Sequence, residues 1–534
     1  MMKYFSQNIK QLTLDTFRSS LESLPKDNRW IKIADSLPWH EIENLYNARL
    51  NNMERGAGNK PARMIIGALI IKHRMVLSDD ETIEAIRENP YMQYLCGLSE
   101  FTDKPIFDGS LFTTIRKRLD NETFNGMSES MLNRQLAEAR RKKAEGLKSS
   151  VESEGMNNHE EDGSGTPPPQ ESAEEGGEVM NKGTLKIDAT CSDAEVRYPT
   201  DLDLLEDGCR IMDRTIGRFC RISGQEKPAT HYKATRSIYL NVIKLRNKPK
   251  QKVRWCMEVL LAWLRRNIEM FWGLVESEPY SRFFELKKSD RRLFFAIIDI
   301  YRQQKAMFKA GVHTCRNRII SIFQPHVRPI VRGKSKAKVE FGAKIGVSVV
   351  EGYTFVDHHS WDAYNEGEDL KFQVELYKER WGFYPARLEG DRIYMNRANR
   401  IWLNTKNIEA AGKPLGRPPK EAREEDYRKK MAKFIGERNE VEATFGTGKR
   451  VYKANNIRAK LSQTAESWNA ACYFVKNVMK FLRDLLHVLI IMVRNNKILS
   501  KIFADFGNIR AKVACRLFMT LSILIIQRTL YRVC

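Results

Sequence analysis

The stretch Leu185-Lys186-Ile187-Asp188-Ala189-Thr190-Cys191 decides the fold of the larger part of this chain. Its apolar residues alternate with polar ones, and this period of two predicts a half-buried β-strand. Asp188 stands in the middle of the strand. An acid there is costly unless it is paired or binds a metal ion, so Asp188 is the first candidate functional residue. The plainer alternative is an acid that caps a turn at the end of a strand.

The sequence around this strand predicts a mixed α/β domain over residues 184–480. Strands are expected at 339–350 and 353–357, joined by a turn at Glu351-Gly352, and a short strand ends on Asp391. Between the first strand and these later ones, apolar residues recur at helical spacing. We therefore expect the domain to be interrupted by a helical insertion at about 206–330.

Residues 1–144 are expected to form a separate helical domain. Ser78 and Glu81 have the spacing of a capping box, which predicts that a helix begins there, and Pro90 predicts that it ends by Asn89. A further helix at 111–119 carries three bases, Arg116, Lys117 and Arg118. Several short helices with a basic surface favour a helix-turn-helix type of DNA binder, and the alternative is a helical bundle with a solvated basic face.

The composition of the whole chain supports a polyanionic partner. The 534 residues include 90 Lys and Arg against 67 Asp and Glu, a formal net charge of +23. The longest apolar stretches, 485–493 and 517–526, are shorter than the roughly 18 residues that a membrane span needs, so no membrane is expected as partner. Nine cysteines without a C-x-x-C pair are typical of reduced thiols. We expect a cytoplasmic, nucleoid-associated protein.

Two segments flank these domains. Residues 145–183 are rich in Glu, Ser and Gly, contain Pro167-Pro168-Pro169, and carry ten acids and one base between 145 and 178. This composition predicts a disordered acidic linker. Residues 481–534 are apolar and predict a helical C-terminal tail, either a dimerisation segment or an altered reading frame appended to a decayed gene.

Three acids in different elements form the candidate catalytic and metal-binding set. Asp188 lies within a strand, Asp391 ends a strand, and Glu442 lies on a helix. Carboxylate oxygens are the ligands that Mg²⁺ prefers, and two ions about 4 Å apart can stabilise both oxygens of a phosphoryl displacement. Glu440 lies about 200° round the helix from Glu442 and would face elsewhere. Glu389, on the same strand face as Asp391, is either a supporting acid or a solvated one.

The motifs around these acids resemble those of DDE transposases of bacterial insertion sequences. Lys186-Ile187-Asp188-Ala189-Thr190 resembles their first-acid strand, and Leu388-Glu389-Gly390-Asp391-Arg392-Ile393-Tyr394 resembles their second-acid motif. Arg438, Glu442 and Lys449 fit the R-x3-E-x6-K signature of the insertion-sequence-four and -five superfamily. That signature normally begins with Tyr where this chain has Ile435. Residues 61–98, 108–119 and 324–346 also resemble parts of these proteins, the last one in a subgroup with a long helical insertion.

The resemblance implies an RNase H-like core in which Asp188 and Asp391 bridge two Mg²⁺ or Mn²⁺ ions and Glu442 completes the site. Metal-activated water would first hydrolyse the element end, and the freed 3′-OH would then attack target DNA. Synapsis of two ends implies a homodimer or a larger assembly. Arg392, Arg438 and Lys449 are the implied contacts to backbone phosphate. A basic loop adds Arg328, Arg332 and Lys334 as DNA-contact candidates, unless it is an ordinary solvated loop.

Three functions are therefore open from the sequence. The first is a DNA transposase that binds the terminal inverted repeats of its insertion sequence and catalyses strand cleavage and transfer. The second is a catalytically inactive, transposase-derived DNA-binding regulator, against which the presence of all three acids argues. The third is a general RNase H-like nuclease, which would have no need of a separate basic helical domain.

Overall fold

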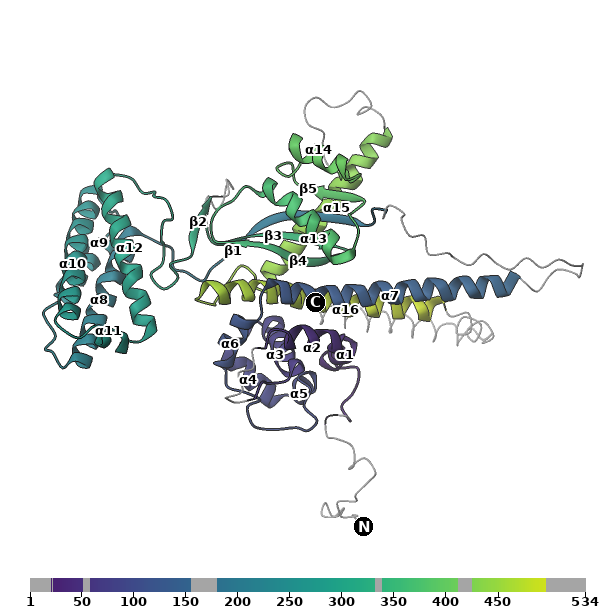
Figure 1. Cartoon of the computed structure of the whole chain (residues 1–534), viewed down its shortest axis with the longest axis horizontal. Helices are drawn as coiled ribbons and strands as arrows, with labels where there is room; N and C mark the ends of the chain where they lie inside the picture. The colour runs from purple at the N-terminus through teal and green to yellow at the C-terminus, as the bar shows by residue number, and fades with distance from the viewer. Residues whose placement is uncertain are drawn as a thin grey trace, which may run out of the picture.

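The computed structural model describes residues 21, 23–50, 58–154, 180–331, 339–411 and 425–495 (Figure 1). The chain begins with helices and continues into a mixed sheet that a second group of helices interrupts. Within the described ranges, no helix combines the length and the apolar character that a bilayer crossing needs.

The described residues of the N-terminal part form seven helices. Ser78 begins one of them as predicted: its hydroxyl accepts from the Glu81 amide at 3.2 Å, and its own amide donates to the Glu81 carboxylate at 2.7 Å. That helix ends at Glu88, before Asn89-Pro90. The helices are α1 (Arg29–Ser36), α2 (Trp39–Asn47), α3 (Ala62–Met75), α4 (Asp79–Glu88), α5 (Pro90–Leu95), α6 (Leu111–Arg118) and α7 (Asn121–Glu154).

Helix α7 is longer than the sequence predicted. It continues to Glu154, so residues 145–154 of the segment predicted as a disordered linker are helical. Adding residues to an existing helix costs much less than nucleating a new one, and this stretch contains no proline. The remainder of the predicted linker, up to residue 179, lies outside the described residues.

The sheet has the order β2-β3-β1-β5-β6, and β4 also pairs with β3. β3 runs antiparallel to β1, β2 and β4, whereas β5 is parallel to β1 and to β6. Glu351 and Gly352 join β3 to β4 with φ of 50° and 76°, the positive values that a tight hairpin turn requires. The strands are β1 (Thr184–Asp193), β2 (Arg328–Val331), β3 (Val339–Val350), β4 (Tyr353–Ser360), β5 (Arg387–Gly390) and β6 (Glu409–Ala411).

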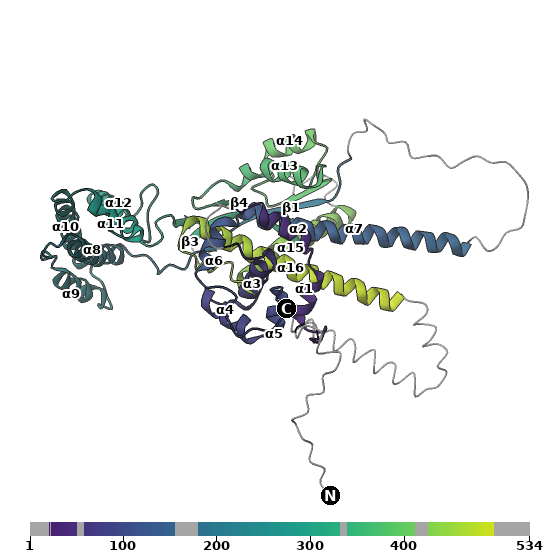
Figure 2. The same cartoon turned by 60° about the horizontal axis from the view of Figure 1, so that its bottom comes forward.

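Helices between and after the strands complete this part. They are α13 (Asp369–Trp381), α14 (Arg397–Thr405), α15 (Glu425–Arg450) and α16 (Ser462–Asn495), with a short 3-10 helix at Glu366–Glu368. Helix α15 packs on β1 and β5, and α16 packs on β4 beside α7 (Figures 1 and 2). The predicted C-terminal tail therefore begins within α16, and its residues 496–534 lie outside the described residues.

The predicted helical insertion separates β1 from β2. It consists of α8 (Asp201–Ser223), α9 (Tyr232–Ile243), α10 (Lys250–Glu276), α11 (Ser281–Glu285) and α12 (Lys288–Ala310). These helices have a hydrophobic core of their own, and the group lies beside the sheet beyond β2 (Figure 1). Residues 328–331, at the end of the predicted insertion, belong to the sheet as β2.

The N-terminal helices and the sheet share one hydrophobic core. This core contains Leu69 of α3, Ile187 of β1, Val347 of β3 and Phe474 of α16, among many others. The two parts therefore form one packed body, even though 145–183 separates them in sequence.

Candidate active site

The register between β1 and β5 brings two of the predicted acids to the same level of the sheet. Ile187 pairs with Gly390 across these parallel strands, and the next residues along the chain are Asp188 and Asp391. Neighbouring strands lie about 4.8 Å apart. Asp391 directly follows the last residue of β5, at the carboxyl edge of the sheet where α/β proteins commonly bind ligands.

Asp188 and Asp391 differ in exposure, but each accepts a hydrogen bond from the backbone amide of the next residue. Asp188 is half-buried, and one of its oxygens accepts from the Ala189 amide at 2.8 Å. Asp391 is exposed and accepts from the Arg392 amide at 2.7 Å. Each such bond holds the carboxylate close to its own backbone, which restricts the positions that the other oxygen can take.

Gly390, the last residue of β5, lies close to Ile187 of β1 and to Tyr394 in the turn that follows Asp391. A side chain at Gly390 would come within 3.2 Å of Ile187 and 3.3 Å of Tyr394, so glycine allows this close approach. Tyr394 is fully buried, and its hydroxyl has no hydrogen-bond partner among the described residues. Burial raises the pKa of Tyr394, and the nearby charges of Glu366 and Asp188 raise it further. Tyr394 therefore forms the apolar floor beside the two acids.

Helix α15 presents Glu440 and Glu442 on opposite flanks of the face that packs on the sheet. Val441, Thr444 and Phe445 are buried and define the face that packs on the sheet. Glu440 lies on one flank of this face, where its carboxylate pairs with Lys186 of β1 at 2.5 Å. Glu442 is exposed on the other flank.

The ion pair of Glu440 indicates where α15 crosses the strand. Lys186 and Asp188 are two residues apart on β1, so their side chains share one face of the sheet, the face that α15 covers. Helical geometry puts residues 438 and 449 on the same flank as Glu442. Lys449 is half-buried there, and the side chain of Arg438 lies outside the described residues.

Glu389, which shares a strand face with Asp391, is not a solvated acid. Its side chain is 3% exposed and pairs with Arg387 of the same strand at 2.8 Å. The charge of Glu389 is thus paired with that of Arg387 within β5, and Asp391 is the exposed acid of the motif.

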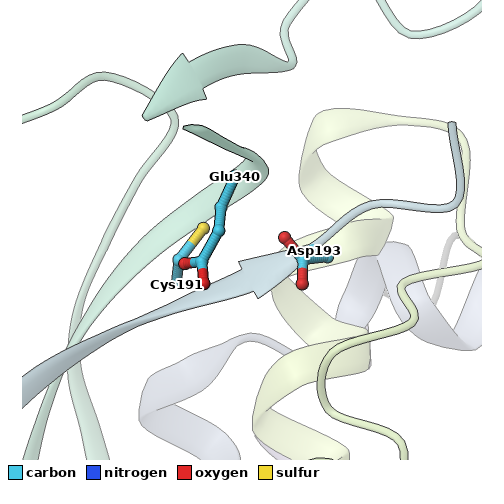
Figure 3. Close-up of side chains that lie close together, drawn as sticks. All are labelled: Cys191, Asp193 and Glu340. Carbon is cyan, nitrogen blue, oxygen red and sulfur yellow. The ribbon is translucent and has the colours of Figure 1, made fainter. Parts of the chain in front are cut away.

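A different group of side chains has the spacing of a metal site within the described residues. Ligand atoms of Cys191, Asp193 and Glu340 all lie within 4.8 Å of one another (Figure 3). Asp188, Asp391 and Glu442 are all described, and as a set of three they do not meet that spacing. Strand alternation puts Cys191 on the opposite face of β1 from Asp188.

Sequence reasoning missed this group of Cys191, Asp193 and Glu340. Cys191 and Asp193 are two residues apart in one strand, so their shared face could have been read from the pattern. Glu340 comes from β3, and only the antiparallel register, in which Asp193 pairs with Gly342, brings it near.

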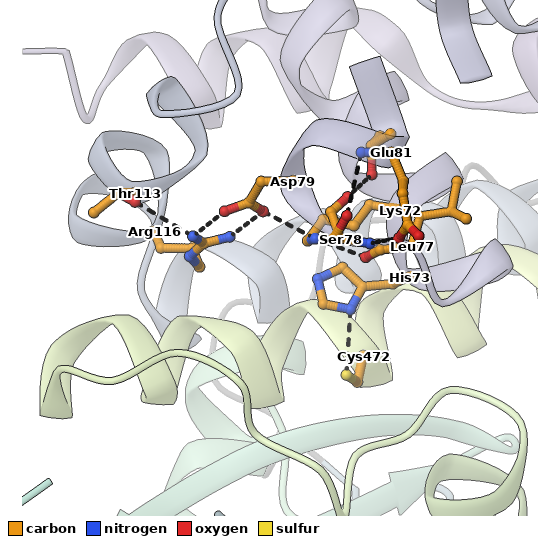
Figure 4. Close-up of polar contacts among 10 residues, drawn as sticks. Lys72, His73, Leu77, Ser78, Asp79, Glu81, Thr113, Arg116 and Cys472 are labelled. Atoms are coloured by element: carbon orange, nitrogen blue, oxygen red, sulfur yellow. Dashed lines mark hydrogen bonds and ion pairs between the residues drawn. The ribbon is translucent and has the colours of Figure 1, made fainter. Parts of the chain in front are cut away.

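Arg116 is not placed for the DNA contact that was predicted for it. Its side chain is 9% exposed and makes two hydrogen bonds to Asp79 of α4, at 2.9 and 2.7 Å (Figure 4). Lys72 of α3 binds the same Asp79 at 2.9 Å. Both cations lie over the ring of Trp468 on α16, at 5.1 Å for Lys72 and 5.7 Å for Arg116. Arg116 therefore joins the N-terminal helices to α16.

Burial at this junction also affects His73. The pKa of His73 is lowered to about 3 by burial and by the charges of Lys72 and Arg116. Its Nδ1 lies 3.4 Å from the Sγ of the buried Cys472 on α16 (Figure 4). The imidazole is consequently neutral in the folded protein at physiological pH.

The other predicted DNA contacts differ in exposure and in their hydrogen-bond partners. Lys117 and Arg392 are exposed, whereas Arg118 is half-buried and donates to Asn59 at 3.2 Å. Arg328 on β2 is half-buried, bonds the carbonyl of Pro325 at 2.5 Å and lies 3.7 Å from Asp362. Arg332 and Lys334 lie outside the described residues.

Comparison with known proteins adds two family matches. Residues 18–118 match the family described as Transposase domain (DUF772), and residues 388–479 match the family described as Transposase DDE domain. The second match contains Asp391 and Glu442, and Asp188 lies outside both.

One curated relative is an uncharacterized protein, ORF8 in the nfe locus of Rhizobium meliloti. It is 30% identical over 106 residues, which are 20% of this chain and 50% of the relative, so the chain spans about half of that protein's length. No solved structure matches the chain. The chain thus matches a transposase domain family near its N-terminus and a transposase DDE domain family nearer its C-terminus, which is consistent with a DDE transposase of an insertion sequence.

Proposed function

We propose that the chain is a DNA transposase that binds the terminal inverted repeats of its insertion sequence, cleaves DNA there and transfers the cut strand to target DNA. The observation that carries this proposal is the register of β1 and β5, in which Ile187 pairs with Gly390, so that Asp188 and Asp391 follow paired residues of neighbouring strands. The two matched transposase domains support the same function. We infer that the mixed sheet is the RNase H-like core.

The donor set suits a divalent metal ion. Asp188, Asp391 and Glu442 offer only carboxylate oxygens, which are the ligands of Mg²⁺ and Mn²⁺. These three acids would hold the ions. When bound, such ions activate water and stabilise the charge that develops on the phosphate.

The protein's own side chains would position this chemistry. Buried Val441 and Phe445 hold α15 on the sheet, the Lys186–Glu440 ion pair adds to this packing, and Glu442 lies on the same helix. Arg392 is exposed beside Asp391, and Lys449 shares the flank of Glu442, so both would bind the phosphates on either side of the cleaved bond. Two ends must meet for transfer, and we infer at least a homodimer.

A cleavage assay separates this proposal from its alternatives. Purified protein would be incubated with a labelled duplex carrying the inverted repeat that flanks the gene, and with a scrambled duplex, in Mg²⁺, Mn²⁺ or chelator. A transposase cuts at the repeat boundary only when metal is present. A regulator binds the repeat and cuts neither duplex, and a general nuclease cuts both duplexes equally.

A further inference from the structure

One stretch of the helical insertion is strongly basic and contains no acid. Between His231 and Trp255 there are eight bases and neither Asp nor Glu. The stretch covers α9, the connection to α10 and the first turn and a half of α10. Its bases, which we call the basic arm, are Lys233, Arg236, Lys244, Arg246, Lys248, Lys250, Lys252 and Arg254.

All eight side chains of the basic arm are exposed, and no acid of the described residues forms an ion pair with any of them. Some other exposed bases of the insertion are paired within one helical turn. Arg265 pairs with Glu269 at 2.7 Å, and Arg302 pairs with Asp299 at 3.5 Å. The basic arm thus concentrates positive charge that no ion pair of the described residues neutralises.

The start of α10 has the wrong charges for an isolated helix. Its first turn contains no acid and its N-cap, Pro249, makes no side-chain hydrogen bond. The positive end of the helix dipole favours anions, yet Lys250 and Lys252 stand there. By contrast, α8 begins with Asp201 and Asp203 and is capped by Thr200. An anion bound at the start of α10 would remove this conflict, and such local conflicts are typical of functional sites.

Packing locates the basic arm at the end of the bundle where the chain enters and leaves the insertion. The Arg254 guanidinium lies 4.5 Å from the ring of Phe308, near the end of α12. The hydroxyl of Tyr239, on α9, donates to Asp203 at the start of α8. The chain enters the insertion at α8 and returns to the sheet after α12, so the basic arm lies beside these two connections.

We propose that the basic arm is a second DNA-binding surface, which holds the phosphate backbone of duplex DNA without reading its sequence. The proposal rests on the proposed function for the presence of DNA, and it adds a contact outside the N-terminal domain and outside the three acids. Exposed bases release counterions when they bind phosphates, which makes the affinity salt-dependent. A membrane fits less well, because Trp255 is the single exposed large apolar side chain described in this stretch.

The test compares two variants of the full-length chain that lose the same charge. The first is Arg246→Gln/Lys248→Gln/Lys250→Gln, which changes the connection and the start of α10. Binding to repeat and unrelated duplexes is measured without metal by fluorescence anisotropy over a range of salt concentrations. We expect affinity to fall at least about tenfold on both duplexes near 0.1 M salt, and the slope of log K against log salt to become shallower by about 2 to 3.

The matched control is Arg265→Gln/Arg282→Gln/Arg302→Gln, in which each base has an acid partner in the same turn. It should bind both duplexes within about twofold of the original protein, because exposed ion pairs of this kind contribute little. Equal thermal unfolding of both variants would verify that they fold. The proposal is overturned if the two variants lose affinity equally, or if the first loses affinity only for the repeat duplex.

Two further outcomes remain distinct. If the first variant binds DNA normally but no longer binds vesicles of phosphatidylserine, the basic arm is a membrane contact and the proposal is wrong. Binding is measured without metal, so this test does not depend on DNA cutting. A protein that never cuts DNA would disprove the proposed function, and the binding result would still decide whether the basic arm contacts DNA.

Discussion

Asp188 and Asp391 follow paired residues of two neighbouring parallel strands, although 391 − 188 = 203 positions separate them in sequence. The same offset of 203 relates every pair of this register, from Thr184 with Arg387 to Ile187 with Gly390. The helical insertion lengthens the chain between the two acids without moving them apart in the sheet. The entropic cost of closing a loop rises only slowly with the length of the loop, so a long insertion is compatible with one compact site.

The flanks of α15 predict which glutamate takes part in cleavage. Glu442→Gln should lower the rate of metal-dependent cutting by at least about a hundredfold, because it removes a ligand oxygen. Glu440→Gln should keep most of the activity and lose some stability, because it breaks the ion pair with Lys186. Single-turnover cleavage and thermal unfolding of both variants check this. A stronger loss of cutting in the Glu440 variant would reverse the assignment.

Arg116 and its neighbour are expected to have separate roles. Arg116→Gln should lower the free energy of unfolding by about 1.5 to 3 kcal/mol, because it removes two charged hydrogen bonds to Asp79, although Lys72 still binds that carboxylate. Lys117→Gln, at an exposed position, should leave stability unchanged and weaken DNA binding modestly. Chemical unfolding and anisotropy measure the two effects. Equal stability of both variants would contradict the structural role of Arg116.

His73 makes the junction between the N-terminal helices and α16 sensitive to acid. Its pKa is about 3 in the folded protein and near 6.5 when unfolded, so the unfolded state binds more protons between these values. Its contribution to stability is complete above about pH 6.5 and is lost as the pH falls toward 3.

The measurement is the free energy of unfolding of His73→Gln between pH 7 and 4. Its decline with acid should be shallower than that of the original protein. His40→Gln changes an exposed histidine and serves as the control, with an unchanged pH dependence. Parallel curves for all three proteins would show that His73 does not carry the effect.

The group of Cys191, Asp193 and Glu340 offers a control for metal binding. Asp193→Asn should lower the number of Mn²⁺ ions bound if that group takes an ion. It should change the rate of cutting in Mg²⁺ by no more than about threefold, because Cys191 and Asp193 face away from Asp188. Calorimetric titration with Mn²⁺ and the cleavage assay report the two effects. A loss of cutting as large as that of an Asp391 variant would move the catalytic ions to this group.

Local patterns predicted several elements of the fold. Alternation predicted the strands at 339–350 and 353–357, and the structure has β3 at Val339–Val350 and β4 at Tyr353–Ser360. The Glu351-Gly352 turn and the Ser78 capping box were also predicted, because each depends on a few neighbouring residues.

Features that depend on distant residues were not predicted. The burial of Arg116 depends on Asp79, 37 residues earlier, and on Trp468 of α16. A charge pattern on a short helix does not reveal such partners. The shared core of the N-terminal helices and the sheet likewise depends on α16, which returns from the far end of the chain. The basic arm was visible in the sequence, but its exposure and its lack of acid partners required the structure.

Asp188 and Asp391 are proposed to hold the catalytic metal ions together, and cutting by variants of each acid tests this claim. Cutting of the repeat duplex is followed for the original protein, Asp188→Asn and Asp391→Asn in Mg²⁺, Mn²⁺ and chelator, with binding to the same duplex measured in parallel. We predict metal-dependent cutting at the repeat boundary by the original protein, none by either variant, and similar binding by all three. Cutting by either variant at the rate of the original protein would contradict the claim.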